Sequence, residues 1–243
     1  SMFSGMKFKT FTLPNDLQVL AISDERFVKS SAAMAVMAGS MQNPDKHLGL
    51  AHFLEHMLFL GTEDFPEVGE YEDYLNKNGG GHNAYTSIDH TNYFFDITHP
   101  GYEGALERFS RFFVNPTFDD KYVEREKNAV NSEHEKNLKD DGRREYRFLQ
   151  MLTDPSHPFS KFATGDANTL KDADRDVVMD FYKKSYSSNL MRLVMMSPLD
   201  ADSMVDLAEK HFGDVPNFKH IRPEFDDKLF IPDQIGRLHH VET

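Results

Sequence analysis

The stretch Gly49-Leu50-Ala51-His52-Phe53-Leu54-Glu55-His56-Met57-Leu58-Phe59-Leu60-Gly61 is apolar except for His52, Glu55 and His56. In a helix, His52 and His56 are one turn apart, so both imidazoles project from one face, and Glu55 lies near that face. Such side chains are costly to bury without partners, and a metal ion would partner them. Two histidines at this spacing suit zinc, with the glutamate as general base. The alternative is a buried helix with incidental polar residues.

The composition excludes several classes of protein and of site. The chain has 243 residues, 39% of them hydrophobic, which is enough for one large domain or two small ones. It contains no cysteine, so any zinc must bind to His, Asp or Glu. The net charge of −13 disfavours a general nucleic-acid-binding role. No run approaches the roughly 20 apolar residues of a membrane span. Localisation stays open, although the absence of disulfides favours the cytoplasm.

Hydrophobic periodicity and turn signals predict an α+β fold. We expect one mainly antiparallel sheet with helices packed against one face. The small apolar strand at 31–38 is predicted to be central, with both faces covered. Residues 1–223 are predicted to form this domain, and 224–243, rich in charge and proline, a tail or linker. The expected strands are 7–13, 17–22, 31–38, 82–86, 91–97 and 189–196, and the expected helices lie around 49–61, 67–78, 102–114, 119–138, 143–152, 172–186 and 201–212.

The long charged helix after Asp119 offers candidates for a third metal ligand. Glu126, Ala129, Val130 and Glu133 share one helical face. The small apolar pair indicates that this face packs inward, and buried carboxylates require a metal or a hydrogen-bonding partner. Physical reasoning leaves Glu126 and Glu133 as near-equal candidates. The alternative is a solvated, glutamate-rich helix.

Together these motifs resemble the pitrilysin and insulin-degrading-enzyme (insulysin) family of zinc metallopeptidases, and in particular its first, zinc-binding domain. The spacing H-x-x-E-H is the inverted form of the H-E-x-x-H motif. The resemblance spans about residues 8 to 220. It rests on His52-x-x-Glu55-His56 with Gly49-Leu50-Ala51 before it and Leu58-Phe59-Leu60-Gly61-Thr62 after it, on Glu126-Lys127-Asn128-Ala129-Val130-Asn131-Ser132-Glu133, and on His157-Pro158-Phe159-Ser160-Lys161-Phe162-x-Thr164-Gly165, which resembles the insulysin branch in particular.

The resemblance implies a zinc endopeptidase with a role for each matching position. Peptides or small unfolded proteins would be the substrates, and the cofactor would be Zn²⁺. The implied zinc ligands are His52, His56 and Glu133, the implied catalytic residues are the general base Glu55 and the ligand-orienting acid Glu126, and the implied substrate-binding residues are Asn83 and Ala84.

The substrate strand also has a physical basis of its own. An exposed strand edge offers backbone groups to an added peptide strand. Gly79-Gly80-Gly81 comes directly before Asn83 and leaves room for close approach. The alternative for Asn83 is an ordinary hydrogen bond at a strand end.

The family resemblance also implies missing partners. Its enzymes have four related domains in two halves, and this chain has the length of one. The remaining domains of the same polypeptide, or a partner subunit, would complete the active site, so the chain alone is expected to cleave peptides weakly. Two alternatives are a non-catalytic structural or assembly subunit of the same fold and a zinc hydrolase acting on a non-peptide substrate. The presence of both histidines, Glu55 and Glu133 argues against the first.

Overall fold

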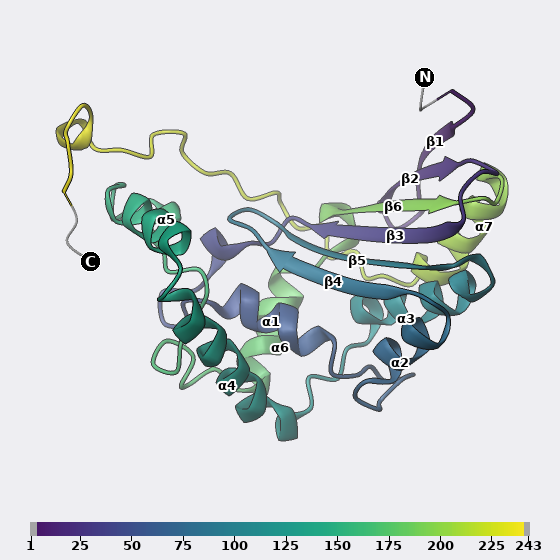
Figure 1. Ribbon diagram of the computed structural model, residues 1–243, viewed down its shortest axis with the longest axis horizontal. Coiled ribbons are helices and arrows are strands. Elements are labelled where there is room, and N and C mark those ends of the chain that lie inside the picture. The colour runs from purple at the N-terminus through teal and green to yellow at the C-terminus, as the bar shows by residue number, and fades with distance from the viewer. Residues whose placement is uncertain (1–3, 241–243) are drawn as a thin grey trace.

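A computed structural model describes residues 4–240 of the chain, and its elements agree closely with those expected (Figure 1). The sequence predicted every strand and helix to within a few residues. The strands are β1 (Lys7–Thr12), β2 (Gln18–Ser23), β3 (Lys29–Val36), β4 (Gly81–Thr86), β5 (Thr91–Thr98) and β6 (Met191–Ser197). The helices are α1 (Leu50–Leu58), α2 (Glu70–Lys77), α3 (Tyr102–Val114), α4 (Asp120–Asn137), α5 (Asp141–Met151), α6 (Arg175–Ser185) and α7 (Ala201–Phe212).

The six strands form one mainly antiparallel sheet in the order β1-β2-β6-β3-β5-β4. Only β2 and β6 pair in parallel among the described strands. Strand β4 is the last in this order and pairs with β5 alone among the described strands, so it is an edge strand. It lies over α1 (Figure 1). The edge that could accept another strand is therefore next to the helix that carries both histidines.

Helices α1, α2, α3, α4, α6 and α7 lie on one side of the sheet (Figure 1), as the sequence predicted, whereas α5 lies beyond the ends of the strands. In β3, Ala32, Met34 and Val36 are buried beneath them, whereas Ala33 and Ala35 between them are partly exposed. The expectation that both faces of this strand are covered is therefore wrong for the described residues. Small side chains occur both in strands with one face open to solvent and in strands covered on both faces. The composition of this strand therefore could not separate the two cases.

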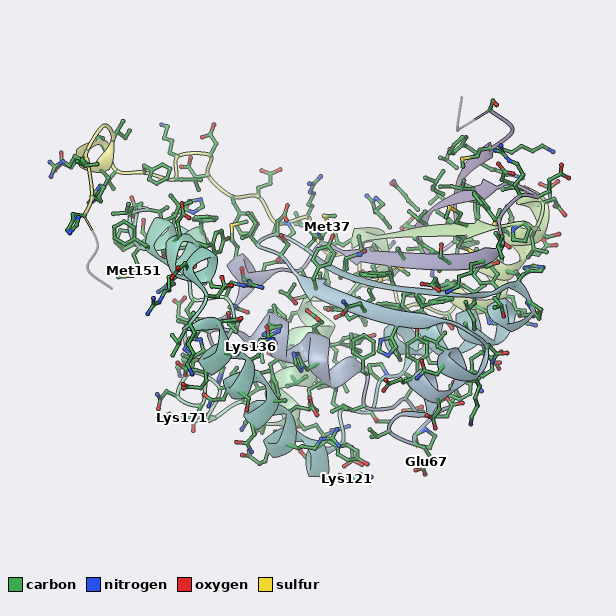
Figure 2. The ribbon with its side chains drawn as sticks, viewed as in Figure 1. Met37, Glu67, Lys121, Lys136, Met151 and Lys171 are labelled. Carbon is green, nitrogen blue, oxygen red and sulfur yellow. The ribbon has the colours of Figure 1, made fainter. Side chains whose placement is uncertain are left out.

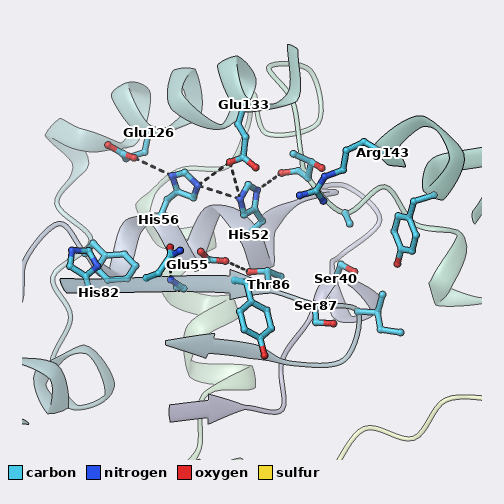
Figure 3. Close-up of a pocket in the computed structure, with 18 of the residues that line it drawn as sticks. Ser40, His52, Glu55, His56, His82, Thr86, Ser87, Glu126, Glu133 and Arg143 are labelled. Carbon is cyan, nitrogen blue, oxygen red and sulfur yellow. Dashed lines mark hydrogen bonds and ion pairs between the residues drawn. The ribbon is translucent and has the colours of Figure 1, made fainter. Parts of the chain in front are cut away.

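Helix α1 runs through the centre of the helical layer. Its apolar side chains Phe53, Leu54, Met57 and Leu58 are fully buried in the core. This burial fixes how the helix is rotated, so His52 and His56 face α4 rather than the sheet (Figure 3). The core thereby determines where both imidazoles point.

Aspartates begin four of the helices as N-caps. The carboxylates of Asp119, Asp140, Asp174 and Asp200 accept backbone N–H groups at the starts of α4, α5, α6 and α7. Because Asp140 caps α5, this helix begins as a separate element rather than as a continuation of α4. Helix α5 lies at the margin of the fold, where Met151 is 66% exposed (Figure 2).

The segment after α7 crosses back toward α5 (Figure 1). The carbonyl of Leu229 accepts the N–H of Asp154 at 2.8 Å, and the carbonyl of Asp226 accepts Nε2–H of His157 at 2.8 Å. The segment therefore packs on the loop after α5. The division at residue 223 into a domain and a tail stays a prediction.

Candidate metal centre and peptide cleft

Three potential metal ligands converge between α1 and α4 (Figure 3). Nε2 of His52 lies 3.3 Å from Nε2 of His56 and 3.4 Å from Oε2 of Glu133. Nε2 of His56 lies 3.7 Å from the same carboxylate oxygen. One ligand atom from each of the three residues lies within 4.8 Å of the others, a spacing that a single metal ion can bridge.

The other ring nitrogen of each histidine has an acceptor. Nδ1–H of His52 donates to the carbonyl of Thr164 at 2.8 Å, and Nδ1 of His56 lies 3.5 Å from Oε2 of Glu126. With the proton on Nδ1, each Nε2 keeps a lone pair that points at the shared centre. Two lone pairs and a carboxylate repel one another unless a cation lies between them. The donor set therefore fits zinc, which favours imidazole and carboxylate ligands.

In the absence of a metal, a proton takes the place of the cation. Burial alone would lower the pKa of His56, but hydrogen bonds to Glu126 and Glu133 outweigh it and raise the pKa to about 9. Hydrogen bonds from His52 and His56 hold the pKa of Glu133 well below its ordinary value. The cluster is thus an anionic centre that binds either a proton or a metal.

Glu126 and Glu133 occupy different positions, although the sequence could not separate them. Glu133 faces Nε2 of both histidines, whereas Glu126 faces Nδ1 of His56 and pairs with Arg125 at 2.9 Å. The expected inward face of α4 is only half right, since Val130 is buried but Ala129 is exposed. The buried stripe runs instead along Val123, Lys127 and Val130, with the two glutamates beside it.

Glu55 lies below the cluster, on the side of α1 that faces β4 (Figure 3). Its side chain is buried, and Oε2 accepts the hydroxyl of Thr86 at 2.5 Å. Burial raises the pKa of Glu55, an effect that His52 and the Thr86 hydroxyl oppose. A buried carboxylate with a raised pKa beside a metal site is typical of a general base.

The cluster opens into a cleft of about 730 Å³. One wall is β4, where Asn83 is exposed and Ala84 is half-buried; the Ala84 N–H donates to Oδ1 of Asn83 at 2.9 Å. Beside this strand, the ring of His82 stacks on Phe59 with centroids 4.9 Å apart. The structure therefore brings the predicted substrate strand and the predicted metal ligands to one cavity.

Sequence reasoning missed several residues that shape this site. Thr86 holds Glu55, the carbonyl of Thr164 orients His52, and Arg143 and Tyr146 of α5 line the cleft. Threonine, tyrosine and arginine in segments of ordinary composition carry no local signal of such a role.

Comparison with known proteins identifies the family of this chain. The profile described as insulinase (peptidase family M16) matches residues 18–156, and the profile described as peptidase M16 inactive domain matches residues 172–240. The chain belongs to the M16 insulinase family of peptidases. Among M16 relatives, insulin-degrading enzyme of Homo sapiens is 40% identical over 242 residues, which cover 97% of this chain and 24% of the relative.

A further relative and a solved structure show the same family similarity. The A-factor-processing enzyme of Saccharomyces cerevisiae is 40% identical over 95% of this chain and 23% of its own length. The crystal structure of pitrilysin superposes with a TM-score of 0.91 and 34% identity, over 94% of this chain and 25% of pitrilysin. The fold is thus that of an M16 peptidase domain, and the chain spans about a quarter of the length of these relatives. No helix among residues 4–240 is long and apolar enough to cross a bilayer.

Proposed function

We propose that this M16 domain is the zinc-binding, catalytic part of an endopeptidase that hydrolyses peptide bonds in peptides or small unfolded proteins. One observation carries the proposal: Nε2 of His52, Nε2 of His56 and Oε2 of Glu133 converge beside the buried carboxylate of Glu55. All of them open into a cleft walled by the edge strand β4. The names of the relatives support peptide hydrolysis as the reaction class.

The proposed roles follow from the contacts of each residue. His52, His56 and Glu133 hold the ion, while Thr164 and Glu126 orient the two imidazoles. When bound, zinc supplies a Lewis acid that polarises the scissile carbonyl and promotes deprotonation of water.

Glu55 transfers the proton in the proposed reaction. Its carboxylate accepts a proton from the attacking water and delivers it to the leaving amine. Thr86 occupies one carboxylate oxygen, which leaves the other for this transfer.

The free edge of β4 positions the substrate in this proposal. An extended peptide adds to Asn83 and Ala84 as a further strand, so backbone hydrogen bonds rather than side chains fix the scissile bond near the ion. When the peptide binds, the Ala84 N–H exchanges its hydrogen bond to the exposed Asn83 side chain for one to the peptide backbone. Backbone recognition favours unfolded substrates, since folded chains keep these groups paired.

We further propose that additional domains of a longer polypeptide, or a partner subunit, complete the substrate site. The chain spans about a quarter of the length of its relatives. Peptide cleavage by the chain alone is accordingly slow, and addition of the missing parts increases it.

Zinc content and peptide cleavage together test the proposal. Elemental analysis should give about one zinc ion per chain, lost in Glu133→Ala and kept in Glu135→Ala, an exposed position on the same helix. Mass spectrometry of a panel of unstructured peptides should show zinc-dependent cleavage that a chelator abolishes. Glu55→Gln should retain zinc and lose cleavage. A Glu55→Gln variant that cleaves at the wild-type rate, or a wild type that binds no zinc, would overturn the proposal.

A further inference from the structure

One wall of the cleft carries a cation that the proposed reaction does not use. Arg143 and Tyr146 are three residues apart on α5, so they share a helical face, and both line the cleft with His52 and Glu133. Figure 3 shows the Arg143 side chain extending from α5 toward the loop beside His52. In Figure 3, Arg143 lies on the same side of the cluster as Ser40 and Ser87, whereas His82 lies on the opposite side.

The guanidinium of Arg143 has no ion pair within residues 4–240, and the two acids directly before it on α5 have other partners. The carboxylate of Asp140 caps α5 by accepting the backbone N–H of Arg143 at 2.8 Å. Asp141 pairs with the next arginine, Arg144, at 3.4 Å. Arg143 therefore presents its donors to the cleft without a protein carboxylate to bind them.

The carboxylates of the cleft are likewise engaged. Glu55 accepts the Thr86 hydroxyl, Glu126 pairs with Arg125, and Glu133 lies between the two histidines. A metal ion at the cluster would offset the charge of these groups further. Among the residues that line the cleft, α5 contributes Arg143 and Tyr146 but no carboxylate, so an anionic side chain at this wall meets a guanidinium that has no carboxylate partner.

Tyr146 adds a neutral donor to the same wall. Its phenol is protonated at neutral pH, and burial raises its pKa above the ordinary 10.0, a shift that the charge of Arg143 opposes. A planar guanidinium with a phenol beside it matches the several acceptor sites of a carboxylate. A carboxamide of the same shape has only one such oxygen and no charge.

The two ends of β4 meet different walls, which gives the cleft a direction. At one end His82 stacks on Phe59, and at the other Thr86 leads to the Ser87 and Ile88 turn near α5. A peptide added to β4 passes the aromatic wall on one side of the metal cluster and the α5 wall on the other. Only residues close to the scissile bond on the α5 side come within reach of Arg143.

We propose that Arg143, with Tyr146, forms a specificity subsite that selects peptides with an aspartate or glutamate one or two residues from the scissile bond, on the α5 side. This inference rests on the proposed peptidase function. It requires no change in the chemistry at Glu55. It concerns only which peptides bind and in which register.

A matched peptide series tests the subsite. A single glutamate is moved along an otherwise neutral, fluorescently labelled peptide, and a second series carries glutamine at the same positions. Affinity is measured by fluorescence anisotropy with the zinc-loaded Glu55→Gln chain. We expect glutamate at one or two adjacent positions to bind about threefold to tenfold more tightly than glutamine, an advantage that salt reduces.

Variants of α5 identify the residue responsible. Arg143→Gln should abolish the preference for glutamate, and Arg143→Glu should replace it with a preference for lysine. Arg144→Gln, one residue further along, is the control and should leave the preference intact. Equal binding of the two series, or a preference that persists in Arg143→Gln, would overturn the subsite.

Cleavage by the wild-type chain separates this inference from the function on which it rests. Zinc-dependent cleavage without a preference between the two series overturns the subsite alone. A preference in binding that depends on Arg143, with no cleavage of any peptide, supports the subsite and overturns the peptidase proposal.

Discussion

The hydroxyl of Thr86 donates a hydrogen bond to Oε2 of Glu55 over 2.5 Å, across the gap between the edge strand and α1. The same strand carries Asn83 and Ala84, the proposed substrate positions. One element thus holds both the peptide and the carboxylate proposed to act on it. A shift of β4 would therefore displace the base and the substrate together.

Replacement of Thr86 tests whether this hydrogen bond positions the base. We expect Thr86→Val to lower kcat about tenfold, because Glu55 loses the donor that fixes its rotamer, with KM and zinc content nearly unchanged. Thr86→Ser keeps the donor and should recover most of the activity. Steady-state kinetics with one peptide measures all three proteins. A fall in zinc content equal to the fall in kcat would indicate a structural role instead.

Replacement of Glu126 should weaken metal binding without removing a ligand. Its carboxylate faces Nδ1 of His56 at 3.5 Å. A carboxamide there loses the charge that orients the ring, so we expect the zinc dissociation constant of Glu126→Gln to rise about 10-fold to 100-fold. Competition with a chromogenic chelator measures it. The control is Glu135→Gln, at an exposed position of the same helix. A complete loss of zinc from Glu126→Gln would make Glu126 a direct ligand.

A glycine contact positions the start of α1 against the loop that orients His52. Gly49 has φ of +91°, and a Cβ there would lie 2.2 Å from Cα of Gly165. We expect Gly49→Ala to destabilise the fold by about 2–4 kcal/mol and to weaken zinc binding, because the Thr164 carbonyl must move.

Gly69→Ala is the matched control for this contact. Gly69 also begins a helix with φ of +88°, but a Cβ there meets nothing within 4 Å. Gly69→Ala should lower the free energy of unfolding only by the backbone strain, about 1 kcal/mol, and should leave zinc binding unchanged. Urea unfolding compares the two variants. Equal losses would mean that backbone strain accounts for the whole effect at Gly49.

The metal-free protein should lose stability as pH rises through the range of His56. The pKa of His56 is raised from its ordinary 6.5 to about 9, so the protonated form is favoured by folding. The resulting stabilisation is fully present below pH 6.5 and is lost as pH approaches 9. We expect a loss on the order of 2 kcal/mol in the free energy of unfolding.

Urea unfolding of zinc-free protein across this pH range measures the effect, with His56→Gln as the reference. The lowered pKa of Glu133 acts at the other end of the range, since its contribution is lost only as pH falls below its ordinary 4.5. Saturating zinc should remove the loss above neutral pH, because the metal replaces the proton. A wild type whose stability follows that of His56→Gln at every pH would contradict the assignment.

The sequence predicted the elements well because their signals are local. The apolar face of α1, the aspartate N-caps and the alternation in β3 and β5 each lie within one element. The parts that could not be predicted depend on contacts between distant segments. Thr164 is 112 residues from His52, and no pattern around it indicates that its carbonyl orients a ring.

The error on α4 has the same origin. Lys127 is 8% exposed, a burial that its composition does not suggest. Its ammonium donates to the carbonyl of Lys171, 44 residues away, and to Glu124. With Lys127 on the buried side of α4, Ala129 faces outward, and both glutamates still reach the histidines. The choice between Glu126 and Glu133 therefore required the rotation of a helix, which only the packed structure supplies.

The candidate metal centre also joins a helix in the core to a helix at the margin of the fold. His52 and His56 are on a helix embedded in the core, whereas Glu133 is on α4, near the margin of the fold. Residues 57 to 132 form a loop that an ion would close, so ion binding restrains the unfolding of α4 more than that of α1. Amide exchange along α4 would accordingly slow when zinc is supplied, while exchange in α1 stays slow throughout. The amide exchange rate along α4 would then report how much of the protein holds a metal ion, without any substrate.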